Sequence, residues 1–94
     1  AGLPTATLFW PGSEAAIRGL RPRRWLRFDG TMSNADRVAR LLSWFDEWPR
    51  PAFATLYFDS IDHAGHDFGP DSPQLNAALA DVDRHIAALL AGLQ

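Results

Sequence analysis

The chain has 94 residues, a formal net charge of −2 and no cysteine, and 47% of its residues are hydrophobic. This composition excludes a disordered chain, a disulfide framework and a thiolate metal site, and it disfavours a dedicated nucleic-acid binder, whose affinity comes mainly from neutralising phosphates. A chain of this length forms one small domain at most, and it contains no apolar run long enough to predict a membrane-spanning helix.

The first fifty residues are rich in turns. Residues 5–9 are predicted to form a short strand, residues 10–12 a turn, and residues 25–28 a second short strand that ends at Asp29-Gly30. The basic segment 18–24 is interpreted as a solvated loop, because the overall acidity of the chain argues against nucleic-acid contact.

The first helix is predicted for about residues 33–48. Its apolar residues recur at the spacing of a 3.6-residue turn, Ser33 and Asp36 resemble a capping box, and Pro49 ends it. The apolar stripe consists of Val38, Leu41, Leu42, Phe45 and Trp48.

The second half of the chain contains a strand and a long helix. Residues 52–58 are apolar on both alternating faces, which favours a strand buried in a parallel sheet over an edge strand. Ser72 and Pro73 are typical of a helix start and predict a helix over about 73–91. Its apolar face would comprise Leu75, Ala78, Leu79, Val82, Ile86, Leu89, Leu90 and Leu93. The order of elements predicts an α/β fold, in which ligands gather at the carboxyl ends of the strands.

A polar segment, "LYFDSIDHAGHDFGPDSP" (56–73), lies at such an end. If it curls into a helical turn, Asp62 and His66 face the same way and can hold one divalent ion, for which zinc is the natural candidate. We expect only this pair, and not Asp59 with His63, to share a face. The alternative is a helix cap and a surface histidine. Two ligands do not complete a catalytic zinc site, which needs about three.

The two remaining histidines, His63 and His85, are expected to face solvent. Asp59, His63 and Asp67 are possible additional ligands, but they lie too close in the chain to converge easily with Asp62 and His66.

A resemblance explains the incomplete ligand set. "TLYFDSIDHAGHDFGPDSP" with the helix "LNAALADVDRHIAALLAGL" resembles the metal-site segment of the type I phosphodiesterase/nucleotide pyrophosphatase family, within the alkaline phosphatase superfamily. "LFWPGSEAAI" and "FDGTMSNADRVARLLSWFDEWPRPAFATLYF" follow the family's order upstream. The resemblance implies a partial alkaline-phosphatase-like fold and places residues 1–94 as a single central segment of a larger catalytic domain. Residues 1–50 would be its turn-rich part with the first helix, and residues 51–94 its strand, metal loop and long helix.

The resemblance also implies the chemistry. Asp62 and His66 would bind one of two catalytic Zn²⁺ ions, and a threonine outside this segment would attack phosphorus. Tyr57 lies where nucleotide-cleaving relatives place an aromatic that stacks on the base, although it could instead be a core strand residue. Trp10 is a weaker substrate-binding candidate by the same analogy, its alternative being a buried turn aromatic.

The expected function is hydrolysis of nucleotide phosphodiester or pyrophosphate bonds, releasing nucleoside monophosphates, in the complete protein and not in this segment alone. The expected partners are a nucleotide or small phosphodiester and the rest of the catalytic domain, without nucleic-acid polymer specificity. Alternatives are a lipid-headgroup, choline-type phosphodiesterase of the same family, or a non-catalytic metal-binding module. By resemblance the protein would be periplasmic or secreted.

Overall fold

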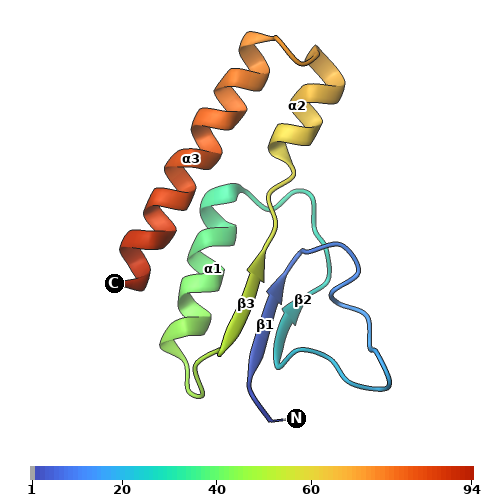
Figure 1. Cartoon of the computed structure of the whole chain (residues 1–94), viewed down its shortest axis with the longest axis vertical. Coiled ribbons are helices and arrows are strands. Elements are labelled where there is room, and N and C mark those ends of the chain that lie inside the picture. The colour runs from blue at the N-terminus through green and yellow to red at the C-terminus, as the bar shows by residue number, and fades with distance from the viewer. Residues whose placement is uncertain (1) are drawn as a thin grey trace. The chain divides into compact units, whose positions relative to one another are not determined.

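The computed structural model describes residues 2–94, which form three strands and three helices in an α/β order (Figure 1). The elements are β1 (Thr5–Leu8), β2 (Arg24–Leu26), α1 (Asn34–Asp46), β3 (Phe53–Leu56), α2 (Ser60–Phe68) and α3 (Pro73–Leu93). They belong to two compact units, one ending at Tyr57 and the other running from Phe58 to Gln94. The sheet and α1 lie in the first unit, and α2 and α3 in the second.

The three strands of the first unit are all parallel, in the order β2-β1-β3. The central strand β1 alternates between buried Ala6 and Leu8 and half-buried Thr5 and Thr7. Helix α1 packs against this strand. Parallel strands need a long crossover connection, and α1 lies in the crossover that joins β2 to β3, whereas β1 and β2 are joined by a long turn-rich segment.

Helix α1 begins where the sequence predicts, because the Ser33 hydroxyl accepts the backbone N–H of Asp36 at 3.0 Å. Val38, Leu41 and Trp44 are buried on its inner face. The helix ends at Asp46, two residues before the predicted end, so Trp48 does not continue the apolar stripe and is exposed.

Strand β3 is parallel, as predicted, but it lies at an edge of the described sheet. It pairs with β1 through the register Thr7 with Thr55, and the described residues place no strand along its other side. Phe53, at its start, keeps 65% of its surface exposed. Its apolar pattern on both faces is that of an interior strand, whereas only one of its edges is paired here.

In the second unit, α2 packs against α3, and the chain reverses between them at Gly69, whose φ of 90° suits glycine. The Ser72 hydroxyl accepts the N–H of Leu75 at 3.1 Å, and Pro73 occupies the first helical turn, as predicted. None of the helices in residues 2–94 has the length and apolarity that a membrane crossing requires.

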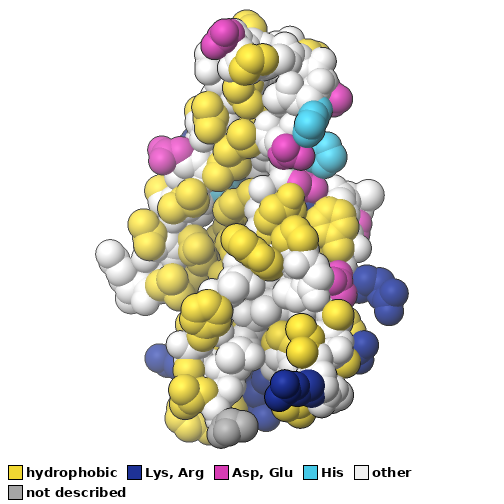
Figure 2. All heavy atoms as spheres, turned by 45° about the vertical axis from the view of Figure 1, so that its right-hand side comes forward, with side chains coloured by type: hydrophobic (Ala, Val, Ile, Leu, Met, Phe, Trp, Pro, Cys, Tyr) yellow, Lys and Arg dark blue, Asp and Glu magenta, His cyan; other side chains and the backbone are white. Residues whose placement is uncertain are grey.

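The apolar residues of α3 form two stripes and not the single buried face that the periodicity predicts. Val82 is buried and Leu75, Ala78 and Leu89 are half-buried. His85 lies on this inner stripe with its side chain 21% exposed, so the prediction that it faces solvent is wrong. The exposed stripe consists of Leu79, Ile86, Leu90 and Leu93. Figure 2 shows many apolar side chains, in yellow, on the face of the molecule that it presents.

Candidate functional site

The polar segment after β3 folds into a complete helix, α2, longer than the single turn that the spacing of Asp62 and His66 requires. Asp59 is the N-cap residue of this helix, and Gly69 ends it by donating its N–H to the Gly65 carbonyl at 3.0 Å. Gly65 faces α3, where an added Cβ would lie 3.8 Å from Cδ1 of Leu75. Helix α2 therefore presents its polar side chains from a regular backbone that α3 supports.

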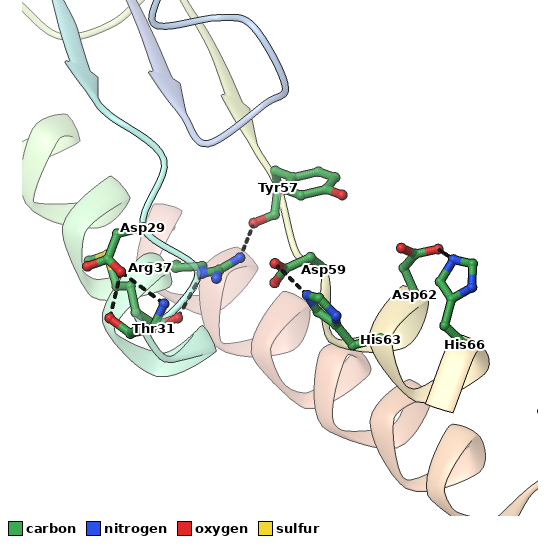
Figure 3. A network of polar contacts seen from close by, with 9 residues as sticks. Asp29, Thr31, Arg37, Tyr57, Asp59, Asp62, His63 and His66 are labelled. Carbon is green, nitrogen blue, oxygen red and sulfur yellow. Dashed lines mark hydrogen bonds and ion pairs between the residues drawn. The ribbon is translucent and has the colours of Figure 1, made fainter. Parts of the chain in front are cut away.

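Asp62 and His66 lie one turn apart on α2 and point toward each other (Figure 3). His66 Nε2 is 3.3 Å from Asp62 Oδ1, and the two side chains are 77% and 69% exposed. The predicted shared face is therefore present. Both donor atoms are accessible to an ion from solvent.

A second pair of the same kind precedes it. His63 Nε2 lies 3.2 Å from Asp59 Oδ2, so the expectation that only Asp62 and His66 can share a face is wrong. The reason is that the segment forms a regular helix from Ser60 to Phe68 with Asp59 as its N-cap residue, which puts residues 59 and 63 one turn apart as well. The pairs differ in burial, because the Asp59 side chain is only 11% exposed whereas His63 is 70% exposed, as expected for that histidine.

The donor set of Asp62 and His66 fits zinc. A tetrahedral zinc ion with bonds of about 2.0–2.2 Å holds adjacent ligand atoms about 3.3–3.5 Å apart, and imidazole nitrogen with carboxylate oxygen is a usual ligand combination. The observed 3.3 Å lies in that range. Within residues 2–94, however, no three histidine or acidic side chains come close enough to share an ion, so this pair alone is an incomplete site.

The first unit carries an aromatic cluster, defined here as Trp10, Phe28 and Tyr57. The Tyr57 ring meets Trp10 at 6.3 Å and Phe28 at 6.5 Å between centroids, both edge to face. Trp10 is 55% exposed, which rules out the buried turn aromatic that was its alternative. Tyr57 is half-buried, so it is neither a full core residue nor a free surface ring.

Phe28 and Arg37 are the residues of this region that the sequence analysis missed. Phe28 was assigned to a strand, but β2 ends at Leu26, and Phe28 is exposed with its N–H bonded to Glu14 Oε2 at 3.2 Å. Arg37 is 1% exposed and donates to the Tyr57 carbonyl from Nη1 at 3.1 Å. The only sequence feature that could have identified Arg37 was the presence of a charged residue at an inward-facing position of α1.

Asp29 follows Phe28 and forms a tight turn with Thr31 (Figure 3). The Thr31 hydroxyl and backbone N–H donate to Asp29 Oδ1 at 2.6 and 2.9 Å. The hydroxyl bond, which has the largest effect, and the backbone N–H bond hold the pKa of the Asp29 carboxyl below its ordinary value. The Arg37 charge adds a smaller effect in the same direction.

A family model and similar known proteins point to the same family. The sequence model of the type I phosphodiesterase/nucleotide pyrophosphatase family matches residues 1–94. A venom phosphodiesterase of Crotalus durissus collilineatus is 40% identical over 95 residues, which cover 99% of this chain and 12% of the venom protein. Human ectonucleotide pyrophosphatase/phosphodiesterase family member 1 is 37% identical over 97 residues, covering 99% of this chain and 10% of its own length.

Similar solved structures belong to the same family. An inactive threonine-to-alanine variant of murine ectonucleotide pyrophosphatase/phosphodiesterase 5, in complex with AMP, matches with a TM-score of 0.88 and 33% identity, over 98% of this chain and 25% of the murine chain. This likeness confirms the expected partial alkaline-phosphatase-like α/β fold. The present chain thus spans about a quarter of that structure and about a tenth of the curated relatives. It belongs to the type I phosphodiesterase/nucleotide pyrophosphatase family.

Proposed function

We propose that the complete protein is a zinc-dependent nucleotide pyrophosphatase/phosphodiesterase that hydrolyses phosphodiester or pyrophosphate bonds and releases nucleoside monophosphates. The observation that carries the proposal is the accessible Asp62–His66 pair, with its donor atoms 3.3 Å apart, in a chain of this family. Family membership supplies the reaction class, and the pair supplies a place where a metal ion would act.

Asp62 Oδ1 and His66 Nε2 would hold one of two Zn²⁺ ions, with the remaining ligands coming from parts of the protein outside this segment. A zinc ion supplies Lewis-acid charge to phosphoryl oxygens when bound. The contribution of this chain is to hold the two donors one turn apart on α2, whose backbone α3 supports through the packing at Gly65. The two side chains are thereby held on one face of a regular helix.

The nucleophile of the proposed reaction is a threonine outside this segment. Two strand threonines, Thr7 and Thr55, have hydroxyls buried in the paired strands, where an attack on a substrate is impossible. Thr31 donates its hydroxyl to Asp29 instead. The inactive threonine-to-alanine variant of the murine relative supports a threonine nucleophile.

The aromatic cluster would bind the nucleotide base. An exposed ring such as Trp10 and a half-buried ring such as Tyr57 offer π faces and edges to any base, and one stacking contact is worth about 1–3 kcal/mol. This cluster favours a nucleotide over a choline headgroup diester. A choline cation also binds aromatic rings, so the choline-type phosphodiesterase stays the second candidate.

The protein is further proposed to act outside the cytoplasm, as a periplasmic or secreted enzyme. Support comes from the names of its relatives, which are venom phosphodiesterases and ectonucleotide pyrophosphatases. Fractionation of cells that express the complete reading frame tests this placement directly.

The function is tested on the complete protein with three substrates that share a p-nitrophenol leaving group. We expect hydrolysis of p-nitrophenyl thymidine monophosphate to exceed that of methyl p-nitrophenyl phosphate and p-nitrophenyl phosphorylcholine. Removal of metal by a chelator should abolish turnover, and zinc should restore it. A preference for the choline ester would establish the second candidate, and full activity without metal would contradict the zinc proposal.

A further inference from the structure

Arg37 is the most buried charged side chain among the described residues, and it belongs to no part of the chemistry proposed above. A buried guanidinium is costly unless its N–H groups find acceptors. Two of its bonds are to backbone carbonyls from separate segments: Nε donates to Met32 at 2.9 Å and Nη1 to Tyr57 at 3.1 Å. Figure 3 shows the guanidinium between these segments.

Both backbone polar groups of Tyr57, its N–H and its carbonyl, are hydrogen-bonded. Its N–H donates to the Leu8 carbonyl at 3.1 Å, and its carbonyl accepts from Arg37. The first bond extends the pairing of β1 and β3 by one residue, but the second comes from α1. The direction in which the Tyr57 side chain leaves the backbone is therefore fixed by the sheet on one side and by Arg37 on the other.

The same guanidinium lies over the ring of Phe9, 5.0 Å from its centroid. Phe9 has a φ of 68°, which is rare for a bulky residue and persists only when its surroundings hold it. Its ring meets Phe28 edge to face at 5.4 Å. Arg37 thus contacts the backbone of one member of the aromatic cluster and the ring that packs against another.

We propose that Arg37 is a positioning residue that fixes the aromatic cluster, through Tyr57, in the orientation that receives the nucleotide base. The inference rests on the proposed function, because it assigns Arg37 a role in nucleotide binding. Arginine suits the role because its rigid fork bonds two carbonyls at once, whereas the single ammonium of lysine cannot reproduce both directions.

The test uses the complete enzyme and compares Arg37→Lys with Arg40→Lys, an exposed arginine one turn further along α1. For Arg37→Lys we expect KM for p-nitrophenyl thymidine monophosphate to rise about tenfold with kcat within about twofold. The kcat/KM for methyl p-nitrophenyl phosphate should not change. Arg40→Lys should leave all of these values at wild type.

A double-mutant cycle with Tyr57→Ala distinguishes positioning of the Tyr57 ring by Arg37 from a general contribution of Arg37 to the stability of the fold. If Arg37 acts through Tyr57, the lysine substitution adds nothing once the ring is gone. An additive effect in that background, an equal loss on both substrates, or an unchanged KM would each overturn the inference. A wild-type enzyme without nucleotide turnover would instead overturn the proposed function, and the inference with it.

A second variant keeps the test decisive if Arg37→Lys does not fold. Phe9→Leu removes the ring beneath the guanidinium and leaves Arg37 in place. Like Arg37→Lys, it should raise KM for the nucleotide substrate, and only when Tyr57 is present. Circular dichroism melting of each variant identifies temperatures at which the kinetics report on folded protein. A Phe9→Leu effect that persists in the Tyr57→Ala background would overturn the inference.

Discussion

His63 Nε2 lies 3.2 Å from Asp59 Oδ2, so α2 presents this pair on a face beside that of Asp62 and His66. Distance alone does not distinguish the two pairs as metal ligands. Burial distinguishes them, because the Asp59 side chain is largely buried whereas those of Asp62 and His66 are both exposed to solvent. We therefore expect the two histidines to behave differently when each is removed.

His66→Ala in the complete enzyme should lower activity by orders of magnitude and reduce bound zinc from about two ions per chain towards one. The reason is that one ion loses one of about three protein ligands, and the charge that develops on a phosphoryl oxygen loses its cation. Metal analysis and turnover measure both effects. His63→Ala is the matched control and should leave both near wild type; the reverse result would mean that the ligand assignment is wrong.

Tyr57→Ala should raise KM for nucleotide diesters and leave methyl p-nitrophenyl phosphate nearly unaffected. The expected loss is about 1–3 kcal/mol in kcat/KM, which corresponds to one stacking contact. Trp10→Ala should act in the same direction, because the two rings touch. Equal losses on both substrates would indicate that Tyr57 only supports the sheet.

Local spacing predicted that Asp62 and His66 share a face, but it did not predict the aromatic cluster. A four-residue separation places Asp62 and His66 on one face in any helix, so the sequence carried that information. Trp10, Phe28 and Tyr57 come from three segments whose meeting depends on the pairing of β1 with its neighbours. No periodicity within a segment encodes such a contact.

The errors on α3 and β3 have a related cause. Apolar residues cover more of α3 than α2 can bury, and periodicity does not say which stripe receives a partner. His85 was assigned to the polar side for that reason, whereas it lies near Phe58, with ring centroids 6.5 Å apart. For β3, the apolar pattern predicted a buried interior strand, whereas the described sheet pairs only one of its edges, because burial depends on neighbours that the pattern does not supply.

The 94-residue chain alone should not hydrolyse p-nitrophenyl thymidine monophosphate, even with added zinc. Its described residues hold two candidate ligands in an exposed pair and no group of three, and the hydroxyls of Thr7, Thr31 and Thr55 are buried or bonded elsewhere. The measurement is p-nitrophenol release against a control that contains zinc without protein. Turnover above that control would show that the segment holds more of the catalytic machinery than its geometry indicates.

The last prediction concerns acid stability and the turn between Asp29 and Thr31. Because the folded-state pKa of Asp29 is lowered, the carboxylate stabilises the fold above its unfolded pKa of about 4, and this contribution is lost as the pH falls through the lowered value. Thr31→Val removes the hydroxyl that is the main cause and keeps the backbone N–H, so the Asp29 pKa should rise towards its ordinary value.

Carbon-13 NMR titration of selectively labelled aspartate in the complete protein measures this pKa, and melting curves between pH 2 and 6 follow the linked stability. In Thr31→Val the Asp29 contribution should be smaller, so the melting temperature should depend less on pH below about 4. Thr31→Ser keeps the hydroxyl and should titrate like wild type. Identical titrations for the valine and serine variants would mean that the hydroxyl bond of 2.6 Å does not set the Asp29 pKa. In that case the backbone N–H and the Arg37 charge would have to account for the shift.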